Sequence, residues 1–222
     1  MKKSAFALML VVCGGFSPAS HGAGQPCEQL ALLALPNVKI TSTQTVAAGA
    51  FTPPAGLPSW MTGDPALYKQ LPAFCRVTAQ SRPSSDSDIQ IEAWMPASSW
   101  NGKFRGQGNG GFAGQLDYRA LAIAVLQGYA SAATDTGHAG NGGEATWALG
   151  HPEKIIDFGY RAIHEMTIVG KAAVKAFYGD AAKYSYFAAC SNGGRQALME
   201  AQRFPEDYNG ILAGAPAKSA TP

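Results

Sequence analysis

The chain has 222 residues, of which 46% are hydrophobic and 14% charged, and its formal net charge is +2. This composition favours a globular fold over disorder, and the length allows one sizeable core. No basic run follows the first three residues, so we do not expect nucleic acid as a partner. Internal repeats and low-complexity tracts are absent from the sequence.

The N-terminus is typical of a targeting segment. Two lysines precede an apolar run over residues 5–13, which is too short to span a bilayer, and small and polar residues follow it. We therefore expect residues 1–24 to be a signal peptide and the protein to be secreted or periplasmic, with residues 25–222 as its folded domain. Lipidation at Cys13 is the second interpretation, since the two valines before it are bulkier than that processing usually accepts.

The first part of the predicted domain reads as a short helix followed by three strands. Residues 27–35 favour a helix that ends at Pro36. The strands are expected over residues 38–46, 71–80 and 88–96. In the last of them, apolar residues alternate with polar ones, which predicts a strand buried on one face only.

From Trp100 onward, predicted strands and helices alternate. The strands are expected over residues 103–107, 129–134, 184–189 and 210–214, and the helices over residues 117–127, 157–178 and 193–204. This alternation implies an α/β fold with a mostly parallel sheet and helices on both faces. Chemistry in such sheets gathers at the carboxyl ends of the strands. Three glycine-rich or polar loops follow strands there: residues 108–114, 135–138 and 190–194.

A serine stands at the sharpest of these turns. The order strand, small-residue turn, helix, with Ser191 at the apex, is typical of a nucleophile elbow, usually written G-x-S-x-G. Here Ala189 replaces the first glycine, and alanine is still small enough for the close approach of helix and strand. An ordinary glycine-rich turn is the alternative interpretation of this local pattern. Arg195, in the next helix, is expected to brace the turn through a salt bridge to a loop carboxylate.

Removal of the signal peptide would leave an odd number of cysteines, namely Cys27, Cys75 and Cys190. Disulfides persist in the oxidising compartment that export implies. Either one thiol is therefore free, or a partner cysteine lies outside this chain.

Three segments together resemble the tannase and feruloyl esterase family: Cys190-Ser-Asn-Gly-Gly-Arg-Gln-Ala197, Gly108-Asn-Gly-Gly-Phe-Ala-Gly114 and Thr134-Asp-Thr-Gly-His138. The resemblance implies an α/β-hydrolase-type sheet, preceded by a small N-terminal β-rich layer, and a Ser-His-Asp triad. Family members are longer, with a lid domain and the acid and histidine of the triad after the strand at 211–214. We therefore expect this chain to be the N-terminal portion of such an enzyme, with an unpaired sheet edge and an exposed apolar patch near Ile211.

The resemblance also implies roles for single residues. Ser191 would be the nucleophile, and the N–H groups of Asn192, Gly110 and Gly111 would form the oxyanion hole. A phosphate-binding role for the glycine-rich loop is disfavoured, because no Gly-Lys-Ser/Thr follows it.

The same resemblance implies the fate of the cysteines and the absence of a cofactor. Cys27 and Cys75 would form a disulfide, whereas Cys190 would bond a cysteine outside this chain. No metal or other cofactor is expected within the chain, because the calcium ion common in the family binds the lid domain.

The general base is not evident among the four histidines. His21 would leave with the signal peptide, His151 precedes a proline in a loop, and His164 lies within a predicted helix. His138 is expected at the same sheet edge as the nucleophile, but the triad of α/β-hydrolases follows the chain order Ser, acid, His. We therefore expect His138 and Asp135 to line the site or to cap the turn.

The predicted function is a secreted serine ester hydrolase that cleaves small esters of aromatic acids, such as feruloyl or galloyl esters, through an acyl-enzyme. Without a base, the isolated chain is expected to be poorly active. A non-catalytic secreted module that binds aromatic or polyphenolic ligands is the alternative. A thiol nucleophile at Cys190 is a third, weaker possibility.

Overall fold

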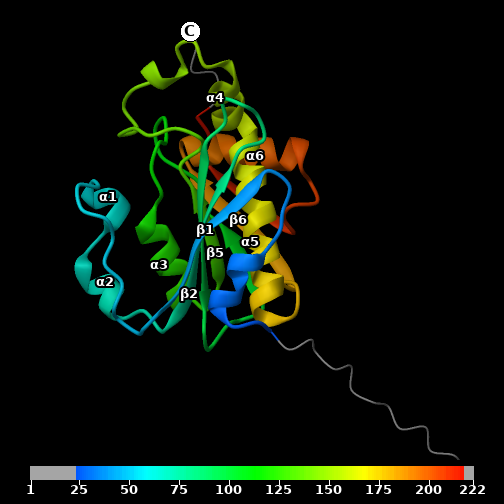
Figure 1. Cartoon of the computed structure of the whole chain (residues 1–222). Coiled ribbons are helices and arrows are strands. Elements are labelled where there is room, and N and C mark those ends of the chain that lie inside the picture. Colours follow the sequence, from blue (N-terminus) through cyan, green and yellow to red (C-terminus); the bar gives the residue numbers. More distant parts are fainter. Residues whose placement is uncertain (1–23, 218–222) are drawn as a thin grey trace, which may run out of the picture.

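The computed structural model describes residues 24–217, so the predicted signal peptide lies outside the described residues except for Gly24. One mixed sheet of seven strands organises this part of the chain, in the order β1-β2-β3-β5-β4-β6-β7 (Figure 1). The strands are β1 Val38–Val46, β2 Phe74–Ser81, β3 Ile89–Pro96, β4 Lys103–Gly106, β5 Ala130–Thr134, β6 Tyr184–Cys190 and β7 Gly210–Gly214.

The sheet is antiparallel in its N-terminal half and parallel in the rest. β1, β2, β3 and β5 pair antiparallel in succession, and β5, β4, β6 and β7 pair parallel. The N-terminal strands therefore extend the same sheet, because β3 pairs directly with β5 at Ile91 and Thr134. All seven strands predicted from the sequence are present.

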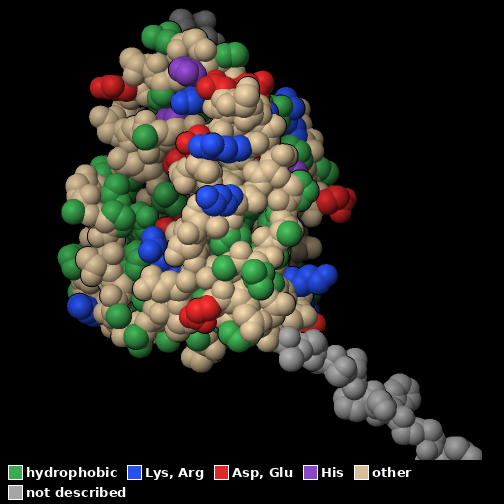
Figure 2. Space-filling model, viewed as in Figure 1, with side chains coloured by type: hydrophobic (Ala, Val, Ile, Leu, Met, Phe, Trp, Pro, Cys, Tyr) green, Lys and Arg blue, Asp and Glu red, His purple; other side chains and the backbone are tan. Residues whose placement is uncertain are grey.

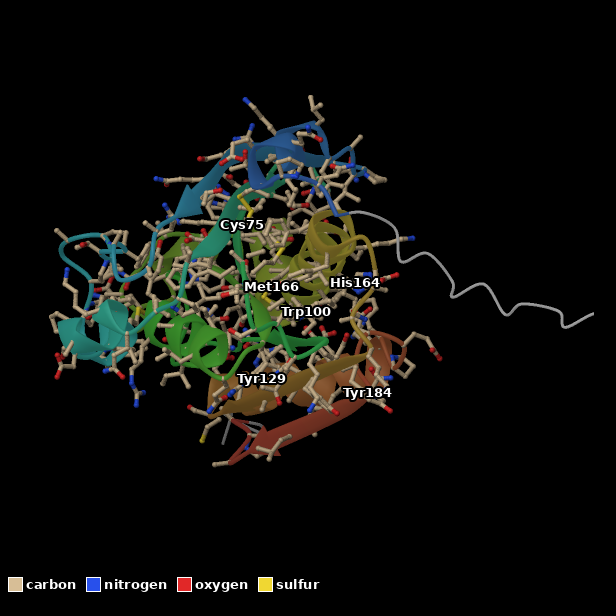
Figure 3. All side chains as sticks on the ribbon, turned by 90° about the horizontal axis from the view of Figure 1, so that it is seen from below. Cys75, Trp100, Tyr129, His164, Met166 and Tyr184 are labelled. Carbon is tan, nitrogen blue, oxygen red and sulfur yellow. A yellow bond between two sulfur atoms is a disulfide. The ribbon has the colours of Figure 1, made fainter. Side chains whose placement is uncertain are left out.

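Helices cover both faces of the sheet, as the alternation of elements predicts. α3 (Tyr118–Leu126) packs on one face together with the short helices α1 (Ser59–Thr62) and α2 (Pro65–Lys69). α5 (Ala162–Tyr178), α6 (Asn192–Arg203) and the 3-10 helix η1 (Cys27–Leu32) pack on the other (Figures 1 and 3). α1 and α2 are not among the predicted elements, although Asp64 caps α2 by accepting a hydrogen bond from the Ala66 N–H.

β3 is buried on both faces, so the prediction of a half-buried strand was wrong. Ile89, Ile91, Ala93 and Met95 enter the core beneath α5, whereas Trp94 packs into a second core beneath α3. Glu92 lies on that second face, where it accepts hydrogen bonds from Arg76 and Trp94 Nε1. The pairing explains why a carboxylate can be buried in a central strand.

The long predicted helix over residues 157–178 consists of two parts and is preceded by a further helix. Helical structure begins earlier than predicted, with α4 (Pro152–Ile156), and passes through a π-helical turn, η3 (Asp157–Arg161), into α5. A π turn inserts one extra residue into the helical hydrogen-bond pattern and is frequent at functional sites. Here it presents the backbone carbonyls of Phe158 and Gly159 to a side chain from α6.

β7 and β1 are the two edge strands of the sheet that the described residues form, and Figure 3 shows them on opposite sides. Leu212 in β7 is 64% exposed and Ile211 is half-buried, so apolar side chains are accessible at this edge, whereas the predicted apolar patch stays a prediction. Charged side chains of both signs are interspersed on the face shown in Figure 2. Among the described helices, none has the length and apolar character that crossing a membrane requires.

Candidate active site

The three loops singled out by the sequence meet at the carboxyl end of the parallel strands. The Gly114 N–H donates to the Asp135 carbonyl at 3.0 Å, which joins the first loop to the second. Asn109 Nδ2 donates to the Thr134 carbonyl at 2.8 Å. Gln196, in the helix after the third loop, bonds Asn109 as well. The predicted convergence is therefore present.

Ser191 occupies a strained backbone conformation at the apex between β6 and α6. Its φ is 61° and its ψ is −123°, a combination that L-residues rarely adopt. Ala113 and Thr136, one in each of the other two loops, also have positive φ. Such strain persists only where the surroundings enforce it and is concentrated at functional sites. The elbow geometry and the exposed Ser191 side chain match what a nucleophile requires.

Glycines surround the elbow because a Cβ atom would not fit at their positions. A Cβ added at Gly193 would lie 2.5 Å from the Ala189 Cβ, and one added at Gly108 would lie 2.6 Å from the same atom. A Cβ at Gly194 would lie 2.3 Å from the Gly214 carbonyl oxygen. The methyl group of Ala189, at the usual glycine position of the motif, is thus accommodated by glycines on the facing segments.

Arg195 braces the elbow, but through neutral oxygen atoms and not through the predicted salt bridge. Its guanidinium donates to the carbonyls of Gly159 and Phe158 at 2.6 and 2.9 Å and to Asn192 Oδ1 at 2.8 Å. It also lies over the Phe158 ring, 4.6 Å from the centroid. Burial lowers the pKa of Arg195, as expected for a cation without a carboxylate partner.

A cavity of about 290 Å³ opens beside Ser191. Its lining residues come from the glycine-rich loop, the π turn, the elbow with the start of α6, and two further loop positions. They are Gly111, Phe112, Gly142, Phe158, Ser191, Asn192, Arg195 and Ala217. Two of the three predicted oxyanion residues, Gly111 and Asn192, therefore share a cavity with the predicted nucleophile. The third, Gly110, lines a neighbouring cavity of about 370 Å³ that Cys190 also borders.

Asp135 and His138 do not line this cavity. They form hydrogen bonds within and between the neighbouring loops. Asp135 Oδ1 accepts hydrogen bonds from the N–H groups of Gln90 and Gly137 at 3.0 and 2.8 Å, which caps the turn. Burial raises the pKa of Asp135 to about 7, although these hydrogen bonds oppose the shift. His138 Nε2 donates to the Phe112 carbonyl at 2.7 Å, and burial lowers the pKa of its ring.

The other two histidines of the described part of the chain are paired with carboxylates. His151 Nδ1 lies 3.0 Å from an oxygen of Asp86, and His164 Nδ1 lies 2.6 Å from Asp207 Oδ2. All three histidines within residues 24–217 are thus engaged away from Ser191. His21 lies outside the described residues.

The aromatic side chains around the cavity are not among the predicted site residues. Phe158 belongs to the π turn, and its ring centroid lies 6.1 Å from that of Phe112 and 5.3 Å from that of Trp147. The Trp147 ring in turn stacks on His138 at 3.8 Å. Phe158 falls within a long helical pattern, so no local sequence signal distinguishes it from a residue of the helix surface.

The disulfide that the resemblance implies is present, whereas the expected bond of Cys190 to a cysteine outside this chain stays a prediction. Cys27 and Cys75 form a disulfide with Cα atoms 5.4 Å apart, and Cys190 is an exposed free thiol. Residues 24–217 contain no group of three or more His, Cys, Asp and Glu side chains that could hold a metal ion.

The sequence is similar to named esterases over most of its length. It is 46% identical over 197 residues to an uncharacterized esterase from Xanthomonas campestris. The matched segment covers 89% of this chain and 33% of that protein. It is 40% identical to a probable feruloyl esterase B-1 from Aspergillus fumigatus, over 82% of this chain and 34% of that protein. The chain thus spans about a third of the length of these relatives.

Solved structures of esterases are also similar to most of this chain. Feruloyl esterase B from Aspergillus oryzae superposes with a TM-score of 0.75 and 38% identity, over 86% of this chain and 36% of that one. Tannin acyl hydrolase from Aspergillus niger superposes with a TM-score of 0.61 and 26% identity, over 82% of this chain and 34% of that one. The family model for tannase and feruloyl esterase matches residues 75–220. This chain belongs to the tannase and feruloyl esterase family, and its fold is that of the α/β-hydrolases.

Proposed function

We propose that the protein is a secreted serine hydrolase of carboxylic esters whose acyl group is an aromatic acid. The observation that carries the proposal is the strained conformation of Ser191, which lines a cavity together with Gly111 and Asn192. The names of the relatives, feruloyl esterase and tannin acyl hydrolase, support the substrate class. The Cys27–Cys75 disulfide is consistent with an oxidising compartment, and a signal peptide would direct the protein there.

In the proposed reaction, Ser191 Oγ attacks the ester carbonyl carbon while a general base accepts its proton. The backbone N–H groups of Asn192 and Gly111 stabilise the oxyanion, and removal of one such donor typically costs about 2.7–4 kcal/mol of transition-state stabilisation. The alcohol leaves with a proton, and water then hydrolyses the acyl-enzyme. Within residues 24–217 no histidine is hydrogen-bonded to Ser191, so we place the general base outside the described residues.

Hydrolysis of methyl ferulate, measured with added imidazole as an external base, tests this proposal. The chain alone is expected to show little turnover, and imidazole is expected to raise the rate in a manner that depends on Ser191. The matched control is Ser191→Ala in the same imidazole concentration, which corrects for direct hydrolysis by imidazole. Equal rates for the two proteins at every imidazole concentration contradict the proposal. Fast turnover without imidazole that is lost in Ser191→Ala shows instead that the base lies within the chain.

A non-catalytic module that binds aromatic ligands is the second candidate. It is favoured by the engagement of His138, His151 and His164 with partners other than Ser191. Labelling with a fluorophosphonate probe in the presence of imidazole distinguishes the two candidates. An esterase site should be labelled at Ser191, whereas a binding module should not. Labelling that persists in Ser191→Ala and disappears in Cys190→Ser would point to the neighbouring thiol, which is exposed.

A further inference from the structure

The glycine-rich loop before the site has most of its backbone donors bonded and leaves the Gly111 N–H free. Four N–H groups of the loop donate at 2.8–3.0 Å, namely those of Asn109, Phe112, Ala113 and Gly114. The Gly111 N–H, by contrast, forms no hydrogen bond with any of the described residues. An oxyanion donor must be unpaired before the substrate arrives, and the Gly111 N–H meets this requirement.

A tight turn over residues 110–113 sets the direction of this free donor. The Ala113 N–H closes the turn by donating to the Gly110 carbonyl at 3.0 Å. Gly111 and Ala113 have φ values of 55° and 60°, which lie in the left-handed region. For alanine this conformation is strained, and such strain persists only where the surroundings enforce it. The turn therefore depends on contacts from outside it.

The loop after β5 supplies those contacts at Phe112. The Phe112 N–H donates to the Gly142 carbonyl at 2.8 Å, and the Phe112 carbonyl accepts from His138 Nε2 at 2.7 Å. The two bonds fix the peptide groups on both sides of Phe112, and Gly111 contributes to the first of them. Unlike the backbone bond to Gly142, the bond to His138 can be removed by substitution.

The His138 ring is held ready to donate. It is buried and stacks on the Trp147 ring, with centroids 3.8 Å apart and ring planes 15° apart. A carbonyl oxygen only accepts, so the bond to Phe112 requires a proton on Nε2. Burial lowers the pKa of His138, so the ring is neutral at neutral pH.

From these contacts we infer that His138 is a positioning residue for the oxyanion hole: its Nε2–H holds the Phe112 carbonyl and thereby the turn that presents the Gly111 N–H. The inference rests on the proposed function, since it takes Gly111 as an oxyanion donor. It assigns a role in the rate of the reaction, and not in substrate affinity, to a histidine that is not hydrogen-bonded to Ser191.

Two substitutions separate the donor from the ring. His138→Phe keeps a ring that can stack on Trp147 but has no donor, whereas His138→Gln loses the ring and keeps an N–H donor at the end of the side chain. His164→Phe is the matched control, because His164 is also hydrogen-bonded, to Asp207, and also stacked, on Phe204 at 3.8 Å. Thermal unfolding verifies that each variant is folded. If His138→Phe is unfolded, the smaller His138→Leu takes its place.

Hydrolysis of methyl ferulate with imidazole as the external base gives the first measurement. His138→Phe is expected to lower kcat about ten- to hundredfold, because misplacement of a catalytic group has a cost of this order. KM should change much less, as expected when an interaction acts in the transition state only. His138→Gln should recover most of kcat, and His164→Phe should keep the parental value.

Amide hydrogen exchange without substrate gives the second measurement and needs no turnover. The amides of Phe112 and Gly114 should exchange faster in His138→Phe than in the parent protein. Exchange in His138→Gln and His164→Phe should stay close to parental. The ring nitrogen shifts of His138 in the parent protein, from ¹⁵N NMR, give a third measurement and should show the proton on Nε2.

Three results would overturn the inference. The first is a parental ring with its proton on Nδ1 only, since Nε2 could not then donate. The second is parental kcat or parental exchange in His138→Phe. The third is an equal loss in His138→Phe and His138→Gln, which would assign the effect to packing. Failure of the proposed function looks different, because imidazole-assisted hydrolysis would not require Ser191, while exchange at Phe112 would still respond to His138→Phe.

Discussion

Gln196 and Asn109 form a reciprocal pair of hydrogen bonds, each 3.0 Å long, between the helix after Ser191 and the glycine-rich loop. Gln196 Oε1 accepts the backbone N–H of Asn109, and Gln196 Nε2 donates to Asn109 Oδ1. Both residues are buried, with 1% and 5% of their surfaces exposed. The pair therefore fixes the loop that carries Gly110 and Gly111 relative to the elbow.

Gln196→Ala is expected to destabilise the fold, because it leaves two buried polar groups of Asn109 without a partner. An unsatisfied buried group costs about 1–3 kcal/mol, and ordered water can offset part of this loss. The midpoint of urea unfolding measures the effect. Gln202→Ala, at an exposed position of the same helix, is the control and should shift the midpoint little. Equal shifts in the two variants would show that the pair contributes nothing to stability.

The packing around Ala189 predicts a compensating pair of substitutions. Gly193→Ala would place two methyl groups 2.5 Å apart, and such overpacking typically costs about 1–3 kcal/mol. Ala189→Gly removes the opposing methyl, and the next nearest atom is then 3.3 Å away. We expect the double variant to be more stable than the Gly193→Ala variant, with a coupling energy of about 0.5–3 kcal/mol.

Gly194→Ala is the control for this cycle, since its nearest contact is the backbone carbonyl of Gly214. Ala189→Gly should not rescue it. Additive effects of Ala189→Gly and Gly193→Ala would contradict the steric explanation.

The features of the elbow that follow from local rules could be predicted from the sequence. Small residues around Ser191 indicate a tight strand–helix turn, and parallel topology brings the ends of neighbouring strands together. The partners of Arg195 could not be predicted, because they are backbone carbonyls of a π turn that no side-chain pattern marks. For the same reason, Phe158 was assigned to an ordinary helix. The burial of Glu92 was missed because its partners, Arg76 and Tyr118, come from a neighbouring strand and from the helix packed on it, and no local pattern gives that packing.

Arg195→Met is expected to loosen the π turn as well as to lower stability. The substitution keeps the apolar contact with Phe158 but removes the donors for two carbonyls and for Asn192 Oδ1. Hydrogen bonds to charged groups contribute about 1.5–3 kcal/mol each when the acceptor is left unsatisfied, less where water can replace the donor. Hydrogen exchange should become faster in residues 157–161. Arg203→Met, which removes the cation over the Tyr160 side chain and leaves the Arg195 bonds to the backbone of the turn in place, should change exchange there much less. Unchanged protection in the Arg195 variant would contradict the bracing role.

Loss of the Cys27–Cys75 disulfide is expected to lower stability without changing the elbow. The cross-link spans 48 residues, and the loop-closure estimate for this length is about 4 kcal/mol, near the upper end of the typical range. The double variant Cys27→Ser, Cys75→Ser should therefore unfold at a much lower urea concentration. Cys190→Ser is the control, since that thiol is free and exposed. A double variant as stable as the control would show that the covalent bond is dispensable.

Glu200, which is fully buried in α6, should make stability depend on pH. Burial and, to a smaller extent, the nearby Asp207 carboxyl group together raise the pKa of Glu200 from 4.5 to about 8, although Lys171 opposes the shift. The folded protein therefore holds a proton that the unfolded chain releases. The stabilisation that this proton contributes is complete below about pH 4.5. It falls as the pH rises from about 4.5 to about 8 and is lost above about pH 8.

Glu200→Gln removes the titration while keeping the shape of the side chain. Unfolding free energies from pH 4.5 to 8 should then fall less steeply in Glu200→Gln than in the parent protein. Asp135 has a raised pKa as well, so only the difference between the two profiles reports on Glu200. Glu206→Gln, at an exposed position, serves as the control and should keep the parental slope. Parallel profiles for the parent and Glu200→Gln would mean that Glu200 is ionised in the folded protein at neutral pH. The buried acid would then need a compensating positive charge, and Lys171 is the lysine that lowers its pKa.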